Sequence, residues 1–176
     1  MKIKELLEKL TLLELDRQEM ESGDKIEAKN FPETVQKIFD LYKQGKLNVY
    51  CPNVFEFDYT STMFALCAVS GKKNKEGKIK YGIGHSLQKH GRKMIEGVLV
   101  TEEMLIKAMK NTQGALFNAL NKRKIIFNPK TNNILFDNNG YVYAITIPRH
   151  NQEVCYLQTV FKADSGYMRN LKRKYK

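Results

Sequence analysis

Residues 125–148, with the sequence IIFNPKTNNILFDNNGYVYAITIP, decide the predicted fold of the chain. Short runs of β-branched and aromatic residues alternate here with Asn, Asp, Pro and Gly, which is typical of strands separated by turns. Asn and Gly tolerate the positive φ angles that tight β-turns need, so the runs predict successive antiparallel strands. A further apolar run over residues 154–161 predicts a closing strand. The C-terminal part is therefore expected to form an antiparallel meander.

Helical spacing of apolar residues dominates the first 45 residues. Leucine and isoleucine recur at helical spacing over residues 2–20, and a second apolar stripe begins after Pro32 and ends before Gly45. The middle of the chain mixes both patterns. Strands are expected over residues 47–50, 60–69 and 78–81. Helices are expected over residues 86–95, after Thr101, which would serve as the N-cap, and over residues 115–120. A terminal helix is expected from about Asp164. This order predicts an α+β fold, divided into a helical N-terminal segment at 1–45 and a basic α+β domain at 46–176.

The charge of the chain is large and unevenly placed. Thirty Lys and Arg residues against 19 Asp and Glu give a net charge of +11, of which residues 1–40 contribute −3 and the remainder +14. Two basic clusters occur at residues 71–93 and 167–176. An excess of this size favours a polyanionic partner, and we expect RNA or another nucleic acid. The candidate contacts are Lys89, Arg92, Lys93, Lys172, Arg173 and Lys174.

Several protein classes are excluded by composition and spacing. The three cysteines are far apart and form neither a disulfide framework nor a Cys-x-x-Cys metal motif. The first twenty residues carry acids among the leucines, unlike a signal peptide, and no apolar run is long enough to span a membrane. We therefore expect a cytoplasmic protein with no membrane partner. Nucleotide-binding glycine motifs are absent and carboxylates are scattered, so neither a cofactor nor a metal is expected.

His85 and His90 are the candidate catalytic pair. Five residues on a regular helix place two side chains about 140° apart, so the rings are expected to converge only if His85 lies in a loop before the helix. Gly82 and Gly84 favour such a loop and would allow close backbone approach to a ligand. The alternative is one capping histidine and one surface histidine. The third histidine, His150, is expected at the surface in a hairpin turn.

The chemistry that suits two histidines among lysines is RNA cleavage without a metal. Attack of a ribose 2′-OH on the adjacent phosphate needs a base, an acid for the leaving 5′-oxygen, and cations for the added charge. Histidine fits both proton-transfer roles because its pKa lies near the working pH. Lys89, Arg92 and Arg169 would stabilise the charge of the transition state.

The order of these motifs resembles a known family. The histidines are followed by Thr-Glu-Glu-x-Leu, by a Lys-Ile-Ile-Phe-Asn-Pro strand, by an Asn-Gly-Tyr hairpin, by a last strand ending in Leu-Gln-Thr159-Val-Phe, and by Asp-Ser-Gly-Tyr167-Met-Arg169. Over about residues 78–173 this resembles the phage and toxin branch of the barnase/EndoU/colicin/RelE-like ribonuclease superfamily. The resemblance implies N-terminal helices followed by a curled antiparallel sheet of about four strands, here with a short C-terminal helix.

The resemblance also implies an activity and a set of site residues. The activity is that of a metal-independent endoribonuclease, a toxin-like or phage-encoded effector. The implied catalytic residues are His85 or His90 from the helical part, Thr159 from the last strand, and Tyr167 and Arg169 after it. Members often have Thr-Ala-Phe or Thr-Ala-Tyr where this chain has Thr-Val-Phe, and residues 1–70 have no counterpart.

Two other functions remain open from the sequence. One is a non-catalytic nucleic-acid-binding or inhibitor protein that acts through its basic surface. The other is an interaction protein whose leucine-rich N-terminal helix docks on a larger partner, such as an immunity protein.

Overall fold

The computed structural model describes residues 2–3, 22–147 and 153–174, with only the backbone described at Asn53, Met168, Leu171, Lys172 and Lys174. The predicted N-terminal helix therefore lies almost wholly outside the described residues, as does His150. None of the described helices is long and apolar enough to cross a membrane.

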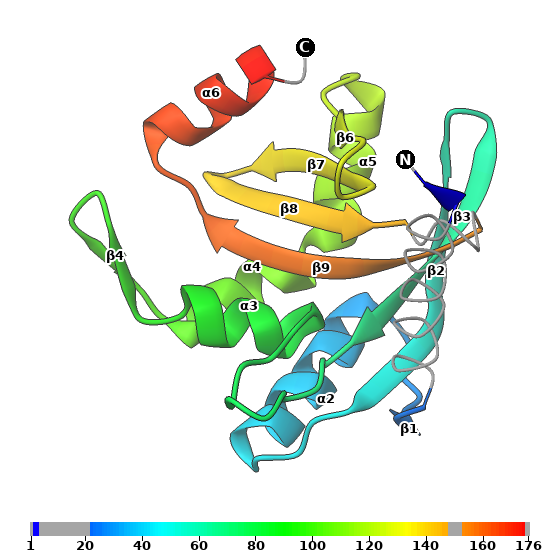
Figure 1. Ribbon diagram of the computed structural model, residues 1–176, viewed down its shortest axis with the longest axis vertical. Coiled ribbons are helices and arrows are strands. Elements are labelled where there is room, and N and C mark those ends of the chain that lie inside the picture. The colour runs from blue at the N-terminus through cyan, green and yellow to red at the C-terminus, as the bar shows by residue number, and fades with distance from the viewer. Residues whose placement is uncertain (1, 4–21, 148–152, 175–176) are drawn as a thin grey trace.

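A seven-stranded mixed sheet organises the described chain (Figure 1). Its spatial order is β1-β2-β3-β9-β8-β7-β6, with parallel pairing of β1 to β2 and of β3 to β9 and antiparallel pairing elsewhere. A separate hairpin, β4–β5, projects from the body. The strands are β1 (Asp24–Lys25), β2 (Val49–Tyr59), β3 (Thr62–Val69), β4 (Lys93–Ile95), β5 (Val98–Val100), β6 (Ile126–Asn128), β7 (Asn133–Asn138), β8 (Tyr141–Thr146) and β9 (Val154–Lys162).

The turns follow from residues that accept positive φ. Asn139 and Gly140 have φ of 52° and 82° and join β7 to β8, which confirms the predicted Asn-Gly hairpin. Thr60 and Ser61 adopt the same kind of turn between β2 and β3, with φ of 51° and 63°. The β2–β3 register shifts between Cys51 and Phe55, where Pro52 has no backbone N–H to donate.

Five described helices pack on this framework, with α4 and α5 behind β7–β9 in Figure 1. Thr101 accepts a hydrogen bond from the Met104 amide at 3.1 Å, which confirms the predicted cap of α4. Asn30 caps α2, whose apolar stripe joins the same core as the sheet and α4. The helices are α2 (Phe31–Lys43), α3 (Gly82–His90), α4 (Glu102–Lys110), α5 (Thr112–Asn121) and α6 (Ser165–Lys174).

The predicted fold class is wrong in its architecture. The sequence predicts N-terminal helices followed by a curled antiparallel sheet of about four strands. The structure instead has a larger mixed sheet, with helices between its strands along the chain. The meander β6–β9 is present, but it continues through β3 into β2 and β1. The decisive contact is the parallel pairing of Ala65–Cys67 with residues 154–156, about ninety residues further along the chain. Such a pairing leaves no local signal, because each strand alone shows only its own apolar pattern.

Helix α3 fills an opening in this sheet. Strand β3 pairs with β9 only from Val154 to Tyr156, so no strand of the described ranges pairs with the remainder of β9 on the side away from β8. Helix α3 lies beside that free edge (Figure 1). The candidate site forms where the helix and the edge meet.

Candidate active site at the free edge of strand β9

Ser86 joins α3 to the free edge of β9. Its hydroxyl accepts a hydrogen bond from the Val160 amide at 3.0 Å and donates one to the Val160 carbonyl, and both residues are fully buried. The hydroxyl thus satisfies the two backbone groups of Val160 that a neighbouring strand would otherwise bind. This contact fixes the rotation of α3 and thereby the direction of its histidines.

The two glycines before Ser86 serve packing within the protein. A Cβ on Gly84 would lie 2.4 Å from the Ser70 carbonyl oxygen, and one on Gly82 would lie 2.3 Å from the Val69 carbonyl oxygen. Gly82 also has φ of 82°, the left-handed region that favours glycine. The predicted close backbone approach therefore exists, but its target is the end of β3, and both glycines belong to α3 itself.

The rings of His85 and His90 converge although both residues lie on one helix. Their centroids are 6.5 Å apart in an edge-to-face arrangement. The expectation that convergence requires His85 in a loop is therefore wrong. On the helix, His85 and His90 lie about 100° and 40° on either side of Ser86, so they flank the contact with β9 and their long side chains meet beyond it.

The surroundings set the protonation of each ring. His85 Nδ1 lies 2.8 Å from the Ile79 carbonyl oxygen, and a carbonyl only accepts, so Nδ1 carries the proton and Nε2 keeps a lone pair. Burial lowers the pKa of His85, which the Ile79 carbonyl partly offsets. Burial, followed by the positive charges of Lys89 and Lys93, lowers the pKa of His90 to about 4. Both rings are therefore neutral at pH 7 in the free protein.

Aromatic side chains from β9 and α6 extend the site. The Phe161 ring stacks on the His90 ring with centroids 4.9 Å apart. The Tyr167 ring meets the Phe161 ring edge-to-face with centroids 5.1 Å apart. Asp164 caps α6 by accepting hydrogen bonds from the amides of Gly166 and Tyr167 at 3.0 and 2.9 Å. Tyr167 is 39% exposed, so its ring borders solvent beside the histidine pair.

Phe161 was not singled out as a site residue from the sequence. It reads there as one more apolar residue of the last strand. Ala144 pairs with Thr159 and Ile145 with Leu157, so the register of β9 shifts by one residue between them. This shift turns Val160 into the core and Phe161 away from it. A β-bulge of this kind has no reliable sequence signature.

Thr159, the predicted hydroxyl of the last strand, has a buried oxygen. Its Oγ1 is inaccessible to solvent and has no hydrogen-bond partner among the residues that the structure describes. It belongs to the same strand as Phe161, two residues earlier, so both side chains point to the same side of β9. The structure thus places Thr159 beside the site with its hydroxyl beneath the surface.

The predicted basic contacts divide between two surfaces. Lys89 and Lys93 are exposed near His90, whereas Arg92 pairs with Glu102 at 3.6 Å, outside the cluster of His85, His90, Phe161 and Tyr167. Arg169 and Arg173 are exposed on α6. The side chains of the remaining two predicted contacts, Lys172 and Lys174, lie outside the described residues.

The lowered pKa of His90 predicts a pH-dependent contribution to stability. The folded state binds a proton at His90 less readily than the unfolded state does. The neutral ring therefore contributes fully to the free energy of unfolding above the unfolded pKa of about 6.5, and this contribution is lost as the pH falls towards 4. His90→Gln keeps a polar side chain that does not titrate. The gap in urea midpoint between pH 7.5 and pH 4.5 is therefore expected to be smaller in the variant than in the wild type. A histidine NMR titration that gives His90 a pKa near 6.5 would contradict this prediction.

The orphaned hydroxyl of Thr159 gives a second prediction. Thr159→Val removes a buried oxygen without a partner, so the free energy of unfolding is expected to rise by about 1 kcal/mol. Thr146→Val is the matched control, because the Thr146 hydroxyl donates to Asn133 Oδ1 at 2.7 Å and its loss is expected to destabilise the protein. Urea unfolding measures both. Equal losses of stability in the two variants would show that the Thr159 hydroxyl is satisfied in solution.

In the described ranges, no three His, Cys, Asp or Glu side chains gather as metal ligands would. Comparison of the chain with protein-family models, with curated proteins and with solved structures finds no match.

Proposed function

We propose that this protein is a metal-independent endoribonuclease whose active site lies between α3, the free edge of β9 and the start of α6. The observation that carries the proposal is the convergence of His85 and His90, with ring centroids 6.5 Å apart beside the partly exposed Tyr167. Two hydrogen bonds of about 2.8 Å to different oxygens of one phosphate span a separation of this size.

The reaction divides its two proton transfers between the histidines. Neutral His85 takes the proton of a ribose 2′-OH at Nε2, while its Nδ1–H stays on the Ile79 carbonyl. The 2′-oxygen forms a bond to phosphorus, and the bond from phosphorus to the 5′-oxygen breaks. Protonated His90 gives its proton to that leaving oxygen. The products are a 2′,3′-cyclic phosphate and a free 5′-hydroxyl.

Substrate binding causes His90 to take up from solvent the proton that it lacks in the free protein. A phosphate anion against the ring favours the charged imidazolium and raises its pKa, opposite in direction to burial and to Lys89 and Lys93. Those two lysines attract the phosphate to the same place. The free site is thus poised to take up one proton together with its substrate.

The tyrosine and the basic helix extend the same surface. Tyr167 offers a ring at the edge of the site on which a neighbouring base would stack. Arg169 and Arg173 on α6 lie exposed next to it in sequence and suit contacts to backbone phosphates. Such contacts add affinity with little dependence on base sequence.

The test is cleavage of a 5′-labelled single-stranded RNA in excess chelator. Fragments that end in a 2′,3′-cyclic phosphate are expected, and the matching DNA, which has no 2′-OH, is expected to stay intact. Saturable binding of the RNA without fragments would overturn the enzyme proposal and favour the non-catalytic nucleic-acid-binding function. Fragments that end in a 3′-hydroxyl would show a different chemistry.

A further inference from the structure

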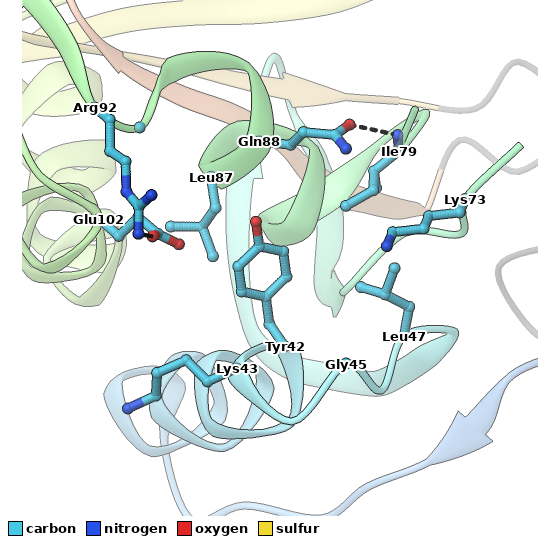
Figure 2. Close-up of a pocket in the computed structure, with 11 residues that line it drawn as sticks. Tyr42, Lys43, Gly45, Leu47, Lys73, Ile79, Leu87, Gln88, Arg92 and Glu102 are labelled. Atoms are coloured by element: carbon cyan, nitrogen blue, oxygen red, sulfur yellow. Dashed lines mark hydrogen bonds and ion pairs between the residues drawn. The ribbon is translucent and has the colours of Figure 1, made fainter. Parts of the chain in front are cut away.

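A cavity lies on the side of α3 that faces away from Ser86 and strand β9, and Ile79, whose carbonyl oxygen lies 2.8 Å from His85 Nδ1, forms part of its wall. It has a volume of about 530 Å3 and is bounded by the end of α2, the loop after β3, α3 and the turn after it. Figure 2 shows Tyr42 rising from α2 towards Gln88, with Lys73 on one side and Arg92 on the other. Gln88 lies about 200° around the helix from Ser86, so this cavity, the Tyr42 pocket, faces away from the contact of Ser86 with β9.

The walls of the Tyr42 pocket are held in place by hydrogen bonds of their own. The Gln88 side chain accepts from the Ile79 amide at 2.7 Å and donates to the Gly77 carbonyl at 2.8 Å, which fixes the loop against α3. The Arg92 amide donates to the Val100 carbonyl at 2.7 Å and fixes the turn after α3. The pocket is therefore formed before any ligand enters.

Three hydrogen-bond donors around the pocket remain free for a ligand. The Tyr42 hydroxyl and the Lys73 ammonium have no hydrogen-bond or ion-pair partner within the described chain. Among the described residues, the guanidinium of the third donor, Arg92, pairs only with Glu102, at 3.6 Å, and the Arg92 side chain is 83% exposed. The Glu102 side chain is only 21% exposed, but the 3.6 Å separation is longer than a direct hydrogen bond and the guanidinium reaches into solvent, so the guanidinium is available to a stronger anion.

The pocket also has an apolar part of ring size. The Tyr42 ring, Leu47, Ile79 and Leu87 line it beside the polar groups. Lys73 and Arg92 suit a phosphate, and the apolar walls suit a flat ring joined to it. A nucleoside monophosphate joins a phosphate to a flat ring and therefore suits both parts of the pocket.

We infer that the Tyr42 pocket binds one nucleoside monophosphate, either as a free nucleotide or as a unit of an RNA chain. The phosphate pairs with the Arg92 guanidinium in place of Glu102, and the positive charge of Lys73, on the other side of Tyr42, adds to the attraction. The base packs on Tyr42, whose hydroxyl donates to the ligand. This inference does not depend on RNA cleavage at the histidine pair.

The experiment is calorimetric titration of the full chain with AMP, GMP, CMP and UMP, with ribose 5-phosphate and inorganic phosphate as probes that lack the base. At least one nucleotide is expected to bind saturably and more tightly than either base-free probe. Lys73→Met and Arg92→Met are each expected to raise its Kd about tenfold, and Tyr42→Phe about threefold. Lys122→Met removes the same charge from an exposed lysine outside the pocket and is expected to leave the Kd unchanged. Thermal unfolding of each variant verifies that it is folded.

Two further measurements distinguish this pocket from the histidine site, and a free nucleotide from a unit of an RNA chain. The single variant His90→Gln is expected to keep nucleotide binding, so loss of cleavage and loss of this pocket are distinguishable. If an oligoribonucleotide competes with the nucleotide and loses affinity in Lys73→Met, the ligand is a unit of RNA; if it does not compete, the ligand is free. No saturable binding by any nucleotide, or equal weakening by Lys122→Met and Lys73→Met, overturns the inference.

Discussion

Replacing either histidine of the converging pair with glutamine is expected to lower the rate of RNA cleavage by about 10²–10⁴-fold. Glutamine at position 85 or 90 keeps a polar side chain but cannot exchange a proton at neutral pH. Cleavage of a labelled RNA under single-turnover conditions measures the loss. RNA affinity, measured separately, is expected to change little, because the phosphate contacts of Lys89 and Lys93 remain.

Two further variants test whether the loss of rate belongs to His85 and His90 in particular. The double variant is expected to lose less than the product of the two single losses, because both rings act on one reaction. His150→Gln is the matched control and is expected to cleave at the wild-type rate. Wild-type cleavage in both single variants and in the double variant would remove His85 and His90 from the mechanism.

The profile of rate against pH carries further information about the same pair. A base and an acid that titrate separately give a bell-shaped profile. In His85→Gln the limb that reports the base is expected to disappear, while the limb that reports the acid remains. A purely structural role of His85 would lower the rate evenly at every pH.

Ser86→Ala is expected to destabilise the protein by about 2–4 kcal/mol. The substitution leaves both the amide and the carbonyl of Val160 without partners, and each unmatched buried polar group costs about 1–3 kcal/mol. Urea unfolding at neutral pH measures the loss. This is a large fraction of the stability of a small protein.

The control for this variant is Ser61→Ala in the exposed turn between β2 and β3. That substitution is expected to change the free energy of unfolding by no more than about 0.5 kcal/mol, because it removes no buried contact. A loss below 1 kcal/mol in Ser86→Ala would mean that another group, or water, satisfies Val160. Such a result would also mean that the positions of His85 and His90 do not depend on the Ser86 contact.

Local signals in the sequence predicted elements that are decided within a few residues. Thr101 was identified as a cap because its hydroxyl reaches an amide three residues later, and the Asn139-Gly140 turn because both residues accept positive φ. The terminal helix was expected from about Asp164 and begins at Ser165. These features depend on backbone geometry that neighbouring residues impose on one another.

The boundaries of α3 show where local reasoning fails. The helix was expected over residues 86–95, yet it begins at Gly82 and ends at His90, and residues 93–95 form a strand. Two glycines ordinarily disfavour a helix, but here only glycine fits against the carbonyl oxygens at the end of β3. Tertiary packing therefore overrides the helix propensity at these positions.

The sequence by itself determined the residue types of the candidate site, the basic charge around them and the last four strands. Only the tertiary structure decided that β3 joins β9, because parallel pairing across ninety residues depends on long-range packing. That pairing stops at Tyr156 and opens the edge where Ser86 docks. The docking turns His85 and His90 towards one another, against the separation that helical spacing alone predicts. Spacing fixes where side chains leave a helix, whereas the contacts of that helix with its neighbours fix where the side chains end.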